Sequence, residues 1–286
     1  MCLAVLIMPI MNAMAKSLTI DYPLTMVVWA RFTGHFVTMT LVFWPSHGPQ
    51  LFKSAKPSIQ FARSAIMFLS NGCYIAALSI VALATASAIM FTAPLIVTAL
   101  SPYFLGERVG IKRFAAVIIG FFGVLIIIRP GLDTPSFDAS AFGITLLLIS
   151  AASFAIYQIL TRKISNQDSA ETMIVYTALI PTIVMTCYIP FIIVLPNHLL
   201  DWLLFLSFGV LGGFTQYLIA KALEEAPASV VSPYLYGELL VAAIIGFAIF
   251  GELPDISTWV GALVIIGSGI FIAYREGVIG NSKASD

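Results

Sequence analysis

Three ionisable side chains lie inside long apolar stretches of this 286-residue chain, where a charge is costly. Glu238 lies within Ser229–Phe250, and Arg31 and His35 lie within Leu24–Trp44. At about 1.5 Å per residue from the same end of their stretches, Arg31 is ~12 Å deep and Glu238 ~18 Å deep. A carboxylate and a guanidinium at similar depth could form a structural ion pair. They could instead bind the basic and acidic groups of one zwitterionic small molecule.

These groups could also move protons. A carboxylate without a partner in apolar surroundings tends to bind a proton, so Glu238 could take one up and release it. If Glu238 pairs with Arg31, it stays ionised and a small molecule must compete for one partner. His35 follows Arg31 by four residues on the same helix face and could carry a proton near neutral pH. A lone histidine at such a position is more often a hydrogen-bonded packing residue.

Polar and aromatic side chains on other apolar stretches could complete a binding site. Tyr234 precedes Glu238 by one helical turn and shares its face. Aromatic rings with a few polar groups suit a planar or amphipathic organic molecule. The further candidates are Asn71, Tyr74, Asn12, Tyr157, Gln158 and Gln216. We identify no catalytic residue, no metal site and no cofactor, because HExxH, GxSxG and Walker motifs are all lacking.

The composition of the chain indicates that these apolar stretches lie in a membrane. The chain is 60% hydrophobic and 10% charged, with a mean hydropathy of +1.00, whereas soluble domains are about 25% charged. No soluble fold of this length buries so much apolar surface, so we expect a multispan membrane protein in contact with the lipid bilayer. The net charge of zero gives no indication of nucleic acid binding.

Ten apolar runs approach the ~20 residues that cross a bilayer. They are Cys2–Leu18, Leu24–Trp44, Ser64–Val81, Ala84–Phe104, Phe114–Ile128, Ala141–Leu160, Thr172–Leu195, Trp202–Lys221, Ser229–Phe250 and Thr258–Tyr274. The first run lacks the basic residues that precede a cleaved signal sequence, so we interpret it as a span. With ten spans, eleven of the 14 Lys and Arg residues collect at one face of the membrane and two at the other. The positive-inside rule therefore predicts that both termini are cytoplasmic in the inner membrane.

The chain repeats itself. The stretch "ALSIVALATASAIMFTAPL" from Ala77 aligns with "ALEEAPASVVSPYLYGELL" from Ala222 at a constant offset of 145, and "FLGERVG" then matches "IFGELPD". This predicts two repeats of five spans, residues 1–135 and 136–286, the second ending in a short cytoplasmic tail. Because five is odd, the second repeat enters the membrane inverted. We therefore expect an all-α membrane protein of ten transmembrane helices in two inverted five-helix repeats.

These features resemble the drug/metabolite transporter superfamily in its EamA-type ten-helix branch. The resemblance lies in the two Gly-Glu pairs, "APL" with Pro94, "ARF" with Arg31, and "RPG" at the end of the fifth span. It covers nearly the whole chain. One departure is Leu239, which occupies the position that matches Pro94.

The resemblance implies a secondary active transporter for a small organic metabolite that is amino-acid-like, riboflavin-like or nucleoside-like, such as S-adenosylmethionine. Proton coupling is an open possibility within it. Exporters of drugs or metallophores share the same fold and form the alternative. A channel or a membrane-embedded enzyme is a remote alternative, since an asymmetric Arg/Glu pair fits a pore poorly and no catalytic constellation is present.

Overall fold

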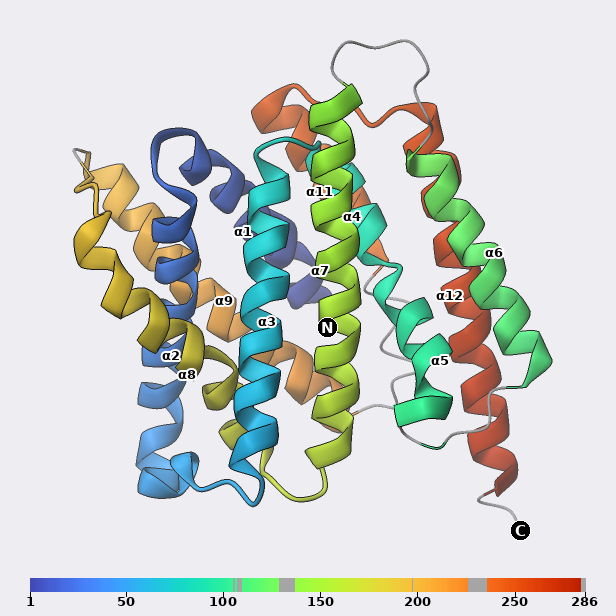
Figure 1. Ribbon diagram of the computed structural model, residues 1–286, viewed down its shortest axis with the longest axis horizontal. Coiled ribbons are helices and arrows are strands. Elements are labelled where there is room, and N and C mark those ends of the chain that lie inside the picture. Colours follow the sequence, from blue (N-terminus) through green and yellow to red (C-terminus); the bar gives the residue numbers. More distant parts are fainter. Residues whose placement is uncertain (105, 107–109, 129–136, 197, 226–235, 284–286) are drawn as a thin grey trace.

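The computed structural model consists of helices packed side by side (Figure 1). It describes residues 1–104, 106, 110–128, 137–196, 198–225 and 236–283. Every regular element among these residues is a helix, which confirms the all-α prediction. Eight segments are long and apolar enough to span a membrane, and Gly237–Phe250 is a shorter apolar helix. Together with the 18-residue helix Ile111–Ile128, they account for the ten predicted spans.

The helices of the first half are α1 (Cys2–Asp21), α2 (Leu24–His47), α3 (Pro57–Leu78), α4 (Leu83–Met90), α5 (Ala93–Phe104) and α6 (Ile111–Ile128), with a 3-10 helix η1 at Gly48–Phe52. Those of the second half are α7 (Phe137–Ile164), α8 (Ala170–Tyr188), α9 (Leu199–Glu225), α11 (Gly237–Phe250) and α12 (Ile256–Lys283), with η2 at Ile189–Phe191. The predicted division between repeats at residue 135 lies outside the described residues and stays a prediction.

The fourth predicted span is interrupted between α4 and α5. Pro94 lacks an amide hydrogen, and its ring collides with the carbonyl four residues earlier, so a regular helix cannot continue through residue 90. Accordingly α4 ends at Met90 and α5 begins at Ala93. Phe91 in the interruption contacts Tyr236 just before α11, with ring centroids 5.2 Å apart. These two residues match at the offset of 145, so matching positions of the two halves meet here.

In the two halves α1 corresponds to α7, α2 to α8 and α3 to α9. Contacts between the halves recur between the corresponding helices. α3 packs on α7 and α9 packs on α1, and likewise α2 packs on α9 and α8 packs on α3. α2 with α8 and α6 with α12 are contacts between matching helices, and α4 with α11 is a contact between the matching fourth and ninth spans. In Figure 1, α6 and α12 run in opposite directions between the two ends of the molecule. This arrangement is the inverted repeat that the sequence predicts.

Two glycines end matching helices in the same backbone conformation. Gly106 follows α5 with φ 67°, and Gly251 follows α11 with φ 68°. Both values lie in the left-handed region, which glycine adopts without strain and which terminates helices. α5 ends at the lower end of the molecule in Figure 1, whereas α11 ends at the upper end.

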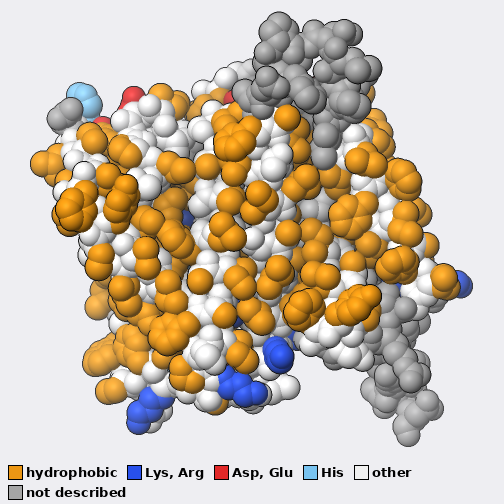
Figure 2. All heavy atoms as spheres, viewed as in Figure 1, with side chains coloured by type: hydrophobic (Ala, Val, Ile, Leu, Met, Phe, Trp, Pro, Cys, Tyr) orange, Lys and Arg blue, Asp and Glu red, His pale blue; other side chains and the backbone are white. Residues whose placement is uncertain are grey.

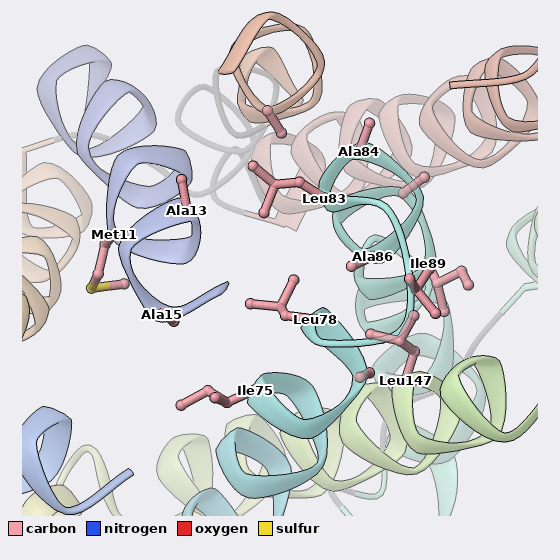
Figure 3. Close-up of a cluster of buried hydrophobic side chains, with 14 of the residues drawn as sticks. Met11, Ala13, Ala15, Ile75, Leu78, Leu83, Ala84, Ala86, Ile89 and Leu147 are labelled. Carbon is pink, nitrogen blue, oxygen red and sulfur yellow. The ribbon is translucent and has the colours of Figure 1, made fainter. Parts of the chain in front are cut away.

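Apolar side chains dominate the flank of the molecule, as expected for a surface in lipid (Figure 2). Lys and Arg side chains gather at the lower end of this view, which holds the starts of α3 and α6. Small and branched residues fill the interior between α1, α3 and α4, including Ala13, Leu78 and Leu83 (Figure 3).

Glycine allows α2 and α9 to cross closely. An ideal Cβ on Gly34 would lie 2.5 Å from the Cα of Gly209. Gly213, one turn further along α9, faces Met39. Gly209 and Gly213 therefore serve packing, since small residues let helices in a membrane approach closely.

Gly34→Ala is expected to destabilise the protein by about 1–3 kcal/mol, because the new methyl group would collide with the backbone of α9. Gly72→Ala on α3 is the matched control, since nothing lies within 4 Å of an added Cβ there. Thermal unfolding of the two purified variants in detergent measures the difference. Equal midpoints would contradict the close crossing of α2 and α9.

Candidate functional site

Glu238 lies at the start of α11 and is 7% exposed. The sequence places it near the middle of a continuous span. In the structure α11 begins at Gly237, so Glu238 lies in the first helical turn. A helix start favours a negative charge, because the positive end of the helix dipole lies there. Tyr234, the predicted neighbour of Glu238, lies outside the described residues.

Asn12 on α1 is the hydrogen-bond partner of Glu238. Its Nδ2 donates to Oε1 of Glu238 at 3.4 Å. α1 runs close to the start of α11, where an ideal Cβ on Gly237 would lie 3.3 Å from Cγ1 of Val5. No ion pair to Glu238 is formed within the described part of the chain. The carboxylate can therefore accept further hydrogen bonds from a bound molecule.

Arg31 does not pair with Glu238, so the structural ion pair considered from the sequence is corrected. Nη1 of Arg31 instead donates to the sulfur of Met11 at 3.2 Å. Its guanidinium lies 5.5 Å from the ring centroid of Phe208, a cation–π contact. Tyr74 on α3 is within electrostatic reach of both Arg31 and Glu238. One positive and one negative group thus stand near the same tyrosine without neutralising each other directly.

His35 lies one turn after Arg31, buried between α2 and α9. Its Cδ2 would lie 3.4 Å from an ideal Cβ on Gly213. Its Nε2 has no hydrogen-bond partner among the described residues. This nitrogen can therefore accept or donate one further hydrogen bond.

The other predicted site residues are not all gathered around Glu238. Asn71 is buried in α3, and its Nδ2 donates to the carbonyl of Met67 at 3.4 Å. Gln158 on α7 and Gln216 on α9 are half-buried. Tyr157 belongs to a separate network around Arg63. The structure therefore brings Asn12 to Glu238 directly and Tyr74 within electrostatic reach of it.

Arg63 is a buried cation that was not predicted as a site residue, and it is 1% exposed. The predicted third span begins at Ser64, so Arg63 counts there as a charge that flanks the span. In the structure α3 begins at Pro57, about two turns before Ser64. Its guanidinium donates to Oε1 of Gln60 at 2.8 Å, to the hydroxyls of Tyr157 and Thr161 at 3.2 Å each, and to the carbonyl of Met173. The polar residues Gln60, Arg63 and Ser64 at i, i+3 and i+4 were the available signal, because they mark one face of a helix.

Asp168, between α7 and α8, continues the Arg63 network. Its carboxylate accepts hydrogen bonds from Oγ of Ser54 at 2.5 Å, from the amide of Ala55 at 2.8 Å and from Nε2 of Gln60 at 2.7 Å. Burial alone raises the pKa of Asp168, but these hydrogen bonds and the charge of Arg63 outweigh it, so the pKa lies below its ordinary value of 3.8. The network joins the start of α3 to both α7 and α8.

The lowered pKa of Asp168 predicts a pH-dependent stability. The folded state favours the ionised carboxylate, so its contribution is present above the ordinary pKa and is lost as pH falls through the lowered one. Asp168→Ala should destabilise the protein by about 2–3 kcal/mol at neutral pH. The stability of the Asp168→Ala variant should fall less steeply than that of the wild type below about pH 4. Unfolding midpoints across this range measure both effects, and parallel curves would contradict the role of Asp168.

A second network lies at the opposite end of the molecule. Nζ of Lys16 pairs with Oε1 of Glu252 at 2.5 Å and donates to the carbonyl of Val81 at 2.9 Å. Oε2 of Glu252 accepts from the amide of Leu83 at 3.3 Å. Glu252 therefore binds both Lys16 and the chain at the start of α4. Within the described residues no group of three or more His, Cys, Asp or Glu could hold a metal ion.

Comparison with known proteins adds evidence of a different kind. A family model described as the EamA-like transporter family matches residues 1–129 and 141–274. An S-adenosylmethionine uptake transporter of Rickettsia bellii is 30% identical over 248 residues, covering 86% of this chain and 83% of that protein. A riboflavin transporter of Vibrio cholerae is 36% identical over 197 residues, covering 66% and 62%. A pseudopaline exporter of Pseudomonas aeruginosa is 25% identical, covering 90% and 88%.

A solved crystal structure has the same fold. It superposes with a TM-score of 0.65 at 16% sequence identity, covering 94% of this chain and 92% of that one. At this identity the likeness concerns the arrangement of the helices alone.

Proposed function

We propose, from the premise that this chain belongs to the EamA-like transporter family, that it carries a small organic metabolite across the cytoplasmic membrane by alternating access. Inverted repeats support this mechanism, because the two halves can exchange conformations and so open the site to each side in turn. The helix contacts that recur between corresponding helices of the two halves support it as well. The names of the similar proteins include both uptake transporters and an exporter.

The observation that carries the choice of solute is the buried carboxylate of Glu238, whose hydrogen-bond donor is the neutral amide of Asn12. A buried carboxylate without a cation favours a ligand that supplies a positive charge. Arg31 offers a separate positive group for an acidic one, and Tyr74 offers an aromatic ring near both. A solute with a cationic centre, a carboxylate and a planar ring satisfies all three.

S-adenosylmethionine has this combination, with a sulfonium, an amino group, a carboxylate and an adenine ring. It is therefore our first candidate, and the similarity to the Rickettsia bellii protein supports it. Riboflavin is the second candidate, supported by the similarity to the Vibrio cholerae protein. Riboflavin is uncharged, so it leaves Glu238 without a counter-ion.

The same proposal includes the topology and the site. We place both termini in the cytoplasm, since Lys and Arg side chains gather at the end that holds the starts of α3 and α6. We place solute contacts at Glu238, Asn12, Tyr74 and Arg31, with His35 as the candidate for proton coupling. The chain acts as a carrier and not as an enzyme, which agrees with the names of the similar proteins.

Uptake by cells that lack their own carriers tests the proposal. Cells expressing the protein should accumulate labelled S-adenosylmethionine saturably, and excess unlabelled compound should suppress the uptake. Uptake of riboflavin without S-adenosylmethionine would overturn the cationic solute. Loss of preloaded compound without uptake would instead indicate an exporter.

A further inference from the structure

The Lys16–Glu252 ion pair joins the two halves of the chain at one end. Lys16 comes from α1, and Glu252 from the loop between α11 and α12. The carbonyl of Val81 and the amide of Leu83, both in the turn between α3 and α4, bind the same pair at 2.9 and 3.3 Å. The Phe250 ring, two residues before Glu252, lies 5.2 Å from Nζ of Lys16. Three separate segments are therefore held together through one pair of charges.

This pair lies directly beyond the candidate solute site. Lys16 follows Asn12 by one turn of α1, and Glu252 follows the end of α11, whose first turn holds Glu238. The same two segments are thus linked at two depths, by Asn12 with Glu238 at 3.4 Å and by Lys16 with Glu252 at 2.5 Å.

Apolar residues close the path between these two levels. Leu83 and Ala84 at the start of α4 are buried (Figure 3). An ideal Cβ on Gly246 of α11 would lie 3.6 Å from Cβ of Leu83, so α4 and α11 are in contact. A path from Glu238 to this end opens only if the α11–α12 loop moves away from α1 and from the α3–α4 turn. Such a movement must break the Lys16–Glu252 pair.

The pair is placed where it can break and re-form. The Glu252 side chain is 29% exposed and that of Lys16 10% exposed, so water can reach the charges when they separate. A partly hydrated pair contributes less than a fully buried one and avoids leaving an unsolvated charge. The Arg63 network differs, because Arg63 is 1% exposed and binds four partners.

We propose that Lys16 and Glu252 form the latch that closes the solute pathway at the end away from the Lys- and Arg-rich face. This assignment rests on the proposed transport function. When the latch breaks, the site around Glu238 opens to that side, and its re-formation closes the site again. The residues act by setting the balance of two conformations and do not touch the solute.

Accessibility of a single thiol tests the latch without any solute. Ser87 lies on α4 one turn after Leu83 and is buried, and its hydroxyl is a hydrogen-bond partner of Tyr74. Ser87→Cys, in a chain whose three native cysteines are replaced by serine, provides the reporter. A membrane-impermeant thiol reagent is applied from the outer side of intact cells. Labelling should be slow with the latch intact and about tenfold faster in Lys16→Gln and in Glu252→Gln.

Two comparisons isolate the ion pair. The double variant should label no faster than either single variant, because both singles break the same interaction. Glu252→Gln keeps an oxygen that can accept from Leu83, so it removes the charge with little effect on folding. Glu171→Gln removes a carboxylate that lies 4.0 Å from Nε2 of His47, away from the latch, and should leave labelling unchanged.

The outcomes separate the latch from the transport function. Faster labelling in both single variants, with an unchanged unfolding midpoint, supports the latch even if no tested solute is carried. Unchanged labelling, or equal acceleration by Glu171→Gln, overturns it even if the protein transports S-adenosylmethionine.

Discussion

Glu238→Gln is expected to weaken solute binding about 10–100-fold at every pH, because a hydrogen bond to a charged group contributes roughly 1.5–3 kcal/mol. Glutamine keeps nearly the same shape and can still accept from Asn12, whose Nδ2 lies 3.4 Å from the carboxylate in the wild type. The change therefore removes the charge and little else. Binding of labelled S-adenosylmethionine to purified protein in detergent, at several pH values, measures the effect.

The pH dependence distinguishes two roles of the carboxylate. If Glu238 carries a proton instead of binding the solute, Glu238→Gln should abolish accumulation driven by a proton gradient and leave exchange without a gradient intact. Glu171→Gln, at the partly exposed start of α8, is the matched control and should change neither. Wild-type binding and wild-type transport by Glu238→Gln under all conditions would make the carboxylate structural.

Arg63→Ala is expected to destabilise the protein by about 3–5 kcal/mol, the range for removing one member of a buried charged network. The change leaves the side chains of Gln60, Tyr157 and Thr161 and the carbonyl of Met173 without their donor. Thermal or denaturant unfolding in detergent measures it. The effect should be smaller in a chain that already carries Asp168→Ala, because Gln60 links both residues in one network.

Lys56→Ala is the matched control for Arg63, since Lys56 is an exposed cation at the start of the same helix. We expect a change within about 0.5 kcal/mol. A similar loss in the two variants would show that the effect comes from net charge at this end of the molecule and not from the buried hydrogen bonds.

The arrangement of spans follows from local properties of the sequence. The lengths of apolar runs and the charges between them place ten helical segments, and the turn between α3 and α4 falls where two runs meet. The offset of 145 indicates the inverted repeat, which the matched helix contacts then display. Even the interruption after α4 has a local cause in Pro94.

The site was less predictable because it depends on rotation and distance. Counting residues from a membrane edge gives the depth of Arg31 and Glu238 but not the direction in which each side chain points. That direction is set by packing, such as the crossing of Gly34 and Gly209 with 2.5 Å between an ideal Cβ and a backbone atom. The structural ion pair, one of the two possibilities that similar depth left open, is therefore not formed between Arg31 and Glu238.

Long-range partners were also out of reach. Arg63 binds Tyr157 and Thr161, which lie 94 and 98 residues further along the chain. Lys16 pairs with Glu252 across 236 residues. No local pattern links such positions, and the repeat indicated only that the Gly-Glu segments correspond, not what binds them.

Counterflow in reconstituted vesicles tests most directly whether this chain is a carrier whose solute binds at Glu238. Vesicles loaded with unlabelled S-adenosylmethionine are diluted into a trace of labelled compound, without any ion gradient. We predict a transient accumulation of label that saturates with concentration and is absent with Glu238→Gln at the same concentration. Flux that neither saturates nor overshoots, or an overshoot that Glu238→Gln leaves unchanged, would contradict this account.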